Sequence, residues 1–122
     1  MKTDNILTDM VTQSDFSNVA ESIRGNLSSA LPKMIEYKTY LQRNVLDVAT
    51  CNELDDVKNG IVNGSLMTKL IILAKSRWQS GATVDLYCLA MSVATIIKEY
   101  DWGTEYLSDK GLFSLAMQIQ NA

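Results

Sequence analysis

One segment of this 122-residue chain, from Thr83 to Tyr100, is apolar on nearly every face that a helix would present. Its apolar residues follow helical spacing: Val84, Leu86, Tyr87, Leu89, Ala90, Val93, Ala94, Ile97 and Tyr100. A helix that is apolar over much more than one stripe is usually covered on several sides. The preceding segment, Ser65 to Trp78, has the same character. We therefore expect these two segments to form a central apolar hairpin of antiparallel helices.

The rest of the chain predicts further helices around this hairpin. They are expected from Thr3 to about Val11, from Phe16 through Pro32 to Leu41, from Thr50 onward, and from Thr104 to Ile119. Pro32 allows either one kinked helix or two helices in sequence, with Pro32 in the first turn of the second. Six glycines and one proline are too few turn residues for a β-sandwich or barrel. We expect an all-α fold: one domain, residues 1–122, forming an irregular bundle of five to seven helices.

Local signals mark some of the helix ends. Thr50 and Glu53 have the spacing of a capping box, in which each side chain bonds the other residue's backbone N–H. Gly64 is expected to adopt the left-handed conformation that ends the helix beginning at Thr50. Gly81 is expected to end the helix that follows. Cys51 and Cys88 lie in apolar stretches and are expected to be buried, unlinked thiols.

Charge and hydropathy exclude some classes of partner. The formal net charge is −3 and the basic residues are scattered, which argues against nucleic-acid binding. The longest apolar runs, such as Leu70 to Ala74, are too short to cross a membrane. The N-terminal residues carry charges and contain no signal-peptide core, so we expect a cytoplasmic protein.

The residue content argues against an enzyme. The chain has no histidine, which removes the usual general base near neutral pH and the commonest zinc ligand. The two cysteines lack zinc-site spacing, and no phosphate-binding glycine motif is present. The acidic pairs Asp55–Asp56 and Glu99–Asp101 would point in different directions on a helix, which suits a solvated face better than a metal site. We expect no catalytic residues, no metal and no cofactor.

The first candidate binding residues lie in the break between the last two helices. Trp102 follows Asp101 and precedes Glu105 and Tyr106. Trp and Tyr are enriched among the residues that dominate protein interfaces, and connections leave side chains less committed to the core. Trp102 is therefore either a cap on the core or an anchor for a partner.

Two further groups are weaker candidates. Asp55 and Asp56, next to Glu53, either stabilise the first turn of a helix or face basic residues of a partner. Tyr37 and Tyr40 fall off the stripe defined by Met34, Ile35 and Leu41, so we expect them to be half exposed, lying along the surface or touching a partner.

The C-terminal segments resemble a known family. Leu89 to Asp101 is an apolar helix ending in Lys-Glu-aromatic-Asp, and Tyr106 to Leu112 follows with a Leu-Ser helix start. This pattern is similar to the C-terminal helices of small helical immunity proteins, which protect bacteria from type VI secreted toxins that hydrolyse NAD. The resemblance covers roughly the last third of the chain. It implies a cytoplasmic protein that binds a cognate toxin domain and occludes its active site.

Three functions follow as hypotheses. The first is an immunity or antitoxin protein whose partner is a toxin domain with a basic surface. The second is another protein-binding module, such as a phage-encoded inhibitor of host defence, a secretion chaperone or an adaptor. The third is an enzyme or small-molecule binder that uses Tyr, Asp and Glu groups in a pocket between helices. The first is the leading hypothesis.

Overall fold

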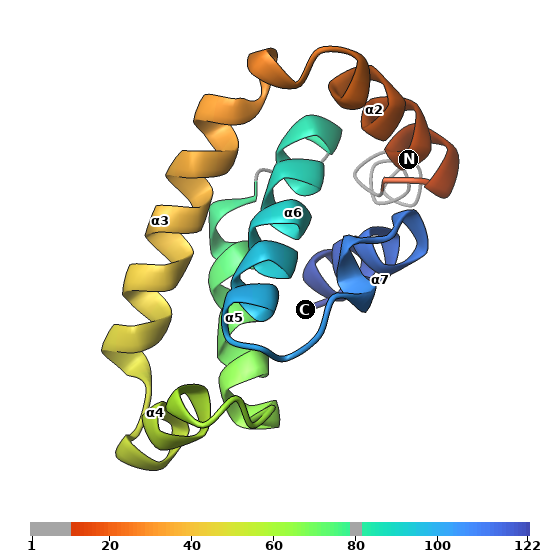
Figure 1. Cartoon of the computed structure of the whole chain (residues 1–122). Helices are drawn as coiled ribbons and strands as arrows, with labels where there is room; N and C mark the ends of the chain where they lie inside the picture. The colour runs from red at the N-terminus through yellow and green to blue at the C-terminus, as the bar shows by residue number, and fades with distance from the viewer. Residues whose placement is uncertain (1–10, 79–81) are drawn as a thin grey trace, which may run out of the picture.

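The computed structural model describes residues 11–78 and 82–122. Within these ranges the elements are α2 (Gln13–Gly25), α3 (Leu31–Val48), α4 (Cys51–Lys58), α5 (Gly64–Arg77), α6 (Thr83–Glu99) and α7 (Asp109–Gln120), with short 3₁₀ helices η1 (Leu27–Ser29) and η2 (Glu105–Leu107) (Figure 1). Six α-helices, and no strand in the described ranges, confirm the predicted all-α bundle. The expected helix from Thr3 lies outside the described residues except for its end at Val11, and so does Gly81.

Helix α6 occupies the centre of the bundle, with α3 on one side and α7 on the other (Figure 1). Ten of its 17 residues are buried, and it also packs against α2 and α5. Each fully buried Leu or Ile side chain contributes about 1.5–3 kcal/mol to folding. By contrast, α5 buries four of its 14 residues and leaves Ile72 56% exposed. Of the two helices expected at the centre, α6 therefore takes that place and α5 lies beside it.

Side chains that bond free backbone N–H groups set several helix starts. The capping box predicted at α4 is confirmed: the Glu53 N–H donates to Thr50 Oγ1 at 3.2 Å, and the Thr50 N–H donates to Glu53 Oε1 at 2.7 Å. Thr12 and Ser108 cap α2 and α7 in the same way, accepting N–H bonds at 3.1 and 3.0 Å. Local sequence therefore fixes where these helices begin.

The two possibilities at Pro32 are resolved in favour of two helices. Helix α2 ends at Gly25, η1 follows, and Pro32 is the second residue of α3. A proline in the first turn of a helix loses no hydrogen bond, because the N–H groups there have no partner within the helix.

The left-handed residue after α4 is Gly60, with φ of 69°, so the prediction of Gly64 is wrong. Asn59-Gly60 and Asn63-Gly64 are the same dipeptide. Their roles differ because the side chain of Asn63 caps the next helix. Its Oδ1 accepts the Leu66 N–H at 3.1 Å and so caps α5. Gly64 consequently becomes the first residue of α5.

Helix α3 buries a different stripe from the expected one. Its buried residues are four apart: Tyr37, Leu41 and Val45. Ile35 is exposed, and the expectation that Tyr37 is half exposed is wrong; Tyr40 is partly buried. The guanidinium of Arg77 on α5 lies 5.7 Å from the centre of the Tyr37 ring and 4.8 Å from that of Tyr40. The inner face of α3 is therefore the one that packs against α6 and α5.

The two cysteines are unlinked, as predicted. Cys88 is buried in α6, and this burial raises the pKa of its thiol to about 11. Cys51 is exposed, so the expectation that both thiols are buried is wrong for Cys51. The reason is its place in the first turn of α4, directly after the cap residue at the surface of the bundle.

Candidate functional site

The C-terminal end of α6 forms a Schellman motif, in which one residue after the helix adopts the left-handed conformation. That residue is Asp101, with φ of 59°. Its N–H donates to the Lys98 carbonyl at 3.0 Å, and the Trp102 N–H donates to the Ile97 carbonyl at 2.9 Å. Glycine suits this conformation best, and a residue with a Cβ atom pays about 1 kcal/mol to adopt it. The motif thus holds the exposed side chain of Asp101 in a strained backbone position.

The same motif directs Trp102 into the core. The residue after the left-handed position commonly makes a hydrophobic contact with the last helical turn. Trp102 is buried, and its ring lies edge-on to that of Tyr100 with centres 5.2 Å apart. Tyr106 is partly buried against the same core. Trp102 therefore caps the core. Trp102 and Tyr106, both predicted as partner contacts, offer a partner little exposed surface.

The connection after α6 also contains buried polar groups that lack hydrogen-bond partners among the described residues. The Trp102 Nε1–H and the Tyr100 hydroxyl are buried and have no hydrogen-bond partner among the described residues. A buried polar group left unpaired costs about 1–3 kcal/mol. Together with the backbone of Asp101, this makes the connection a locally strained segment, which is typical of functional sites.

The end of α4 repeats the motif of α6. The Ile61 N–H donates to the Asp56 carbonyl at 2.8 Å, and the Gly60 N–H donates to the Val57 carbonyl at 3.2 Å. A Cβ atom placed on Gly60 would lie 3.5 Å from the Cβ of Asp101. The α4–α5 and α6–α7 connections therefore meet at one end of the bundle (Figure 1). The structure thus brings the residues at the end of α4 close to those at the end of α6, although the two segments are far apart in the sequence.

We call this end of the molecule the helix-end surface and define it by six residues: Asp55, Asp56, Ile61, Val62, Asp101 and Glu105. Ile61 and Val62 are 53% and 60% exposed, and neighbouring exposed aliphatic side chains are typical of contact sites. None of its four carboxylates forms an ion pair within the described part of the chain. Lys58 and Lys98 in the last turns of α4 and α6 bring some positive charge to the same end. The surface is therefore mixed, with an excess of acidic groups.

Glu53 is close to this surface in sequence but lies in the interior. Its carboxylate accepts hydrogen bonds from Lys69 Nζ at 2.7 Å, from Ser65 Oγ at 2.5 Å and from the Thr50 N–H. The bond from Lys69, followed by those from Ser65 and Thr50, lowers the pKa of Glu53 to about 2. The sequence grouped Glu53 with the two following aspartates; the structure assigns it to the attachment of α4 to α5.

Glu105 and Tyr106 are positioned by the contact of η2 with α7. A Cβ atom on Gly111 would lie 2.1 Å from the Glu105 carbonyl oxygen and 2.6 Å from the Tyr106 Cα. Only glycine allows this approach. The exposed carboxylate of Glu105 also lies close to Gly103, whose φ is 119°. Glycines thus shape this side of the helix-end surface.

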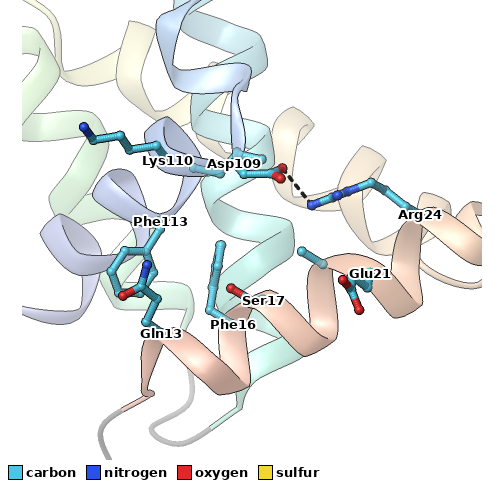
Figure 2. Close-up of a pocket in the computed structure, with 10 residues that line it drawn as sticks. Gln13, Phe16, Ser17, Glu21, Arg24, Asp109, Lys110 and Phe113 are labelled. Atoms are coloured by element: carbon cyan, nitrogen blue, oxygen red, sulfur yellow. Dashed lines mark hydrogen bonds and ion pairs between the residues drawn. The ribbon is translucent and has the colours of Figure 1, made fainter.

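A hollow of about 510 Å³ lies between α2 and α7 (Figure 2). Phe16 and Phe113 line it, with ring centres 5.7 Å apart. At one end Arg24 Nη2 donates to Asp109 Oδ1 at 2.7 Å, and this ion pair links the two helices. Figure 2 shows Lys110 extending away from the hollow. Arg24 and Asp109 thus pair with each other, and Gln13, Ser17 and Glu21 are further polar residues of the lining.

In residues 11–78 and 82–122, no three His, Cys, Asp or Glu side chains gather closely enough to hold a metal ion. No helix in those ranges has both the length and the apolar character needed to cross a bilayer.

Comparisons with protein-family models, curated proteins and solved structures gave no match to this chain. The helix-end surface is therefore assigned from its own geometry.

Proposed function

We propose that this chain is an immunity-type inhibitor, which binds a bacterial toxin domain through the helix-end surface and covers the toxin's active site. One observation carries the proposal: exposed Ile61 and Val62 directly follow Gly60, which approaches Asp101, and the exposed side chain of Asp101 is held by a strained backbone. Backbone strain at an exposed polar residue favours a functional role. The adjacent aliphatic side chains supply the apolar centre that a specific interface needs.

The charge of the surface supports a cationic partner site. Toxins that act on NAD, the class suggested by the resemblance, bind a substrate with a negatively charged pyrophosphate. Carboxylates such as Asp101 and Glu105 can occupy a cleft of complementary charge in place of that group. The net charge of −3 also favours steering toward a basic cleft. In this proposal the chain acts in the cytoplasm, carries out no chemistry and needs no cofactor.

Co-expression with the product of the neighbouring gene tests the proposal. We expect the chain to restore growth and to co-purify with that product. The double variant Ile61→Ser/Val62→Ser should lose protection and bind at least about tenfold more weakly, because central apolar contacts each contribute more than about 1 kcal/mol. Both side chains are more than half exposed, so the variant should still fold. Ile72→Ser on α5, where the side chain is 56% exposed, is the matched control and should protect normally.

Two outcomes would change the assignment. If the double variant folds and protects as well as the parent chain, the helix-end surface does not bind the toxin. If the native host yields a nuclease or a secretion component as the partner, and no toxin, the alternative is favoured: an inhibitor of host defence, a secretion chaperone or an adaptor.

A further inference from the structure

The connection from α6 to α7 is anchored at both of its ends (Figure 1). It leaves the end of α6, a helix with ten buried residues. At its far end η2 lies against α7, where the Glu105 carbonyl oxygen is 2.1 Å from the position that a Cβ atom on Gly111 would take. Residues 101–104 therefore form a short segment between two anchored helices, which we call the strap. Trp102 is the only large apolar side chain in the strap.

The buried position of Trp102 leaves two polar groups unpaired. Trp102 and Tyr100 are 6% and 8% exposed, and the Trp102 Nε1–H and the Tyr100 hydroxyl have no hydrogen-bond partner among the described residues. Buried polar groups of native proteins are nearly always paired, and each one left unpaired favours a conformation in which water reaches it. The other tryptophan differs: the Trp78 Nε1–H donates to the Ala82 carbonyl at 2.9 Å.

The backbone of the strap is also in an unusual conformation on both sides of Trp102. Asp101 has φ of 59° and Gly103 has φ of 119°. A residue with a Cβ atom adopts a positive φ only at a cost in free energy, whereas glycine adopts it freely. Strained residues of this kind gather at switch segments, and the residues beside a moving group absorb the change in backbone angles. Gly103 thus provides a hinge next to the strained Asp101.

Opposing contributions decide whether Trp102 stays buried. Burial of an indole ring is among the largest apolar contributions that one side chain makes. The unpaired Trp102 Nε1–H, the unpaired Tyr100 hydroxyl and the backbone of Asp101 oppose it, and their summed cost is of the same order. Since the two rings are 5.2 Å apart, departure of the indole would also uncover Tyr100. When such contributions nearly cancel, a second conformation is populated at roughly 0.1–10%.

We propose that the strap is a conformational switch. In the closed state Trp102 caps the core; in a minor open state of the free chain it swings out beside Asp101 and Glu105, and the partner of the helix-end surface selects that state. The selection by a partner rests on the proposed function, whereas the exchange of the free chain does not. Tryptophan is enriched among the residues that dominate interfaces, so the open state adds an aromatic anchor to Ile61 and Val62. The closed state keeps this anchor covered until the partner is present.

Relaxation-dispersion NMR of the two indole N–H groups tests the switch in the free chain. The Trp102 signal should show exchange on the microsecond-to-millisecond timescale. Tyr100→Phe removes an unpaired group from the closed state, so it should lower the open population at least about fivefold and raise the melting temperature. Tyr106→Phe is the matched control in the same connection and should leave the exchange unchanged, since its hydroxyl is not one of the buried unpaired groups. The paired indole of Trp78 should not respond to either variant.

Addition of the unlabelled neighbouring gene product to the ¹⁵N-labelled chain tests the selection of the open state. The Trp102 indole signal should move much further than that of Trp78, and Trp102→Phe should bind at least about tenfold more weakly.

Three results would overturn the proposal. The first is a flat dispersion profile for Trp102, as expected if an ordered water holds its N–H in a single buried state. The second is exchange that Tyr100→Phe leaves unchanged. The third is a complex in which the Trp102 indole signal stays where it is in the free chain. If the neighbouring gene product does not bind at all, the proposed function fails, and the dispersion measurement on the free chain still decides whether the switch exists.

Discussion

At the scale of single residues, Glu53 shows how one buried carboxylate fixes a short helix. It completes the cap of α4 through the Thr50 N–H and bonds Ser65 and Lys69 on α5. Lys69 in turn donates to the Val48 carbonyl at 3.1 Å, at the end of α3. A helix as short as α4 is marginal alone in water, so these contacts position it. They therefore also position the α4–α5 connection that carries Ile61 and Val62.

The lowered pKa of Glu53 predicts a dependence of stability on pH. In the folded chain its pKa is about 2, against an ordinary value of 4.5. The folded state therefore binds a proton less readily than the unfolded state, and the stabilisation is fully present above pH 4.5. It should be lost as the pH falls from 4.5 to 2. Urea unfolding across this range should show a steeper loss for the parent chain than for Glu53→Gln. Parallel loss in the two proteins would contradict the prediction.

At the scale of elements, the contact of η2 with α7 depends on Gly111. Gly111→Ala should destabilise the fold by about 3 kcal/mol, because the added methyl group overlaps the backbone of Glu105 and Tyr106 and forces η2 to move. The matched control is Gly64→Ala at the start of α5, where nothing lies within 4 Å of the added carbon. That change should be neutral or stabilise by about 0.5 kcal/mol. Thermal unfolding of the two variants tests this prediction. Equal melting temperatures would show that the close contact of η2 with α7 does not stabilise the fold.

Helix starts could be predicted from sequence because their signals are local. The capping box of Thr50 and Glu53 involves residues three apart, and proline in a first turn is favoured wherever the helix lies in space. Gly64 was predicted wrongly because two identical dipeptides compete, and the choice depends on the bond made by the Asn63 side chain. Local signals thus specify an element but not always its end.

The candidate site was less accessible to prediction because it forms only in the folded chain. The sequence identifies Asp55, Asp56 and Asp101 only as separate groups, because the approach of Gly60 to Asp101 depends on how α5 packs beside α6. It does not identify Ile61 and Val62 as surface residues, since an aliphatic pair in a sequence is expected in the core. A helix followed by Asp-Trp-Gly does contain a usable signal: the residue after a left-handed position commonly turns toward the core, as Trp102 does.

At the scale of the whole molecule, the helix-end surface is formed by the α4–α5 and α6–α7 connections and has an excess of acidic groups. The proposed partner of this surface is a cationic site on a toxin domain. The central claim is the role of the helix-end surface, and Asp101 is the residue at which that claim can be separated from stability.

Asp101→Gly should change stability and binding in opposite directions. Glycine removes the strain of the left-handed backbone, so the melting temperature should rise by about 3–5 °C, the shift that about 1 kcal/mol gives in a domain of this size. The same change removes an exposed carboxylate, so affinity for the toxin should fall about tenfold. Asp101→Asn separates the two effects: asparagine tolerates this backbone, so stability should stay near that of the parent chain while affinity falls.

The most direct test is therefore calorimetric titration of the neighbouring gene product with the parent chain, Asp101→Gly and Asp101→Asn. The predicted result is weaker binding by both variants, with Asp101→Gly melting higher than the parent chain. If Asp101→Gly melts higher but both variants bind as tightly as the parent chain, Asp101 serves only to end α6, and the helix-end surface does not bind the toxin.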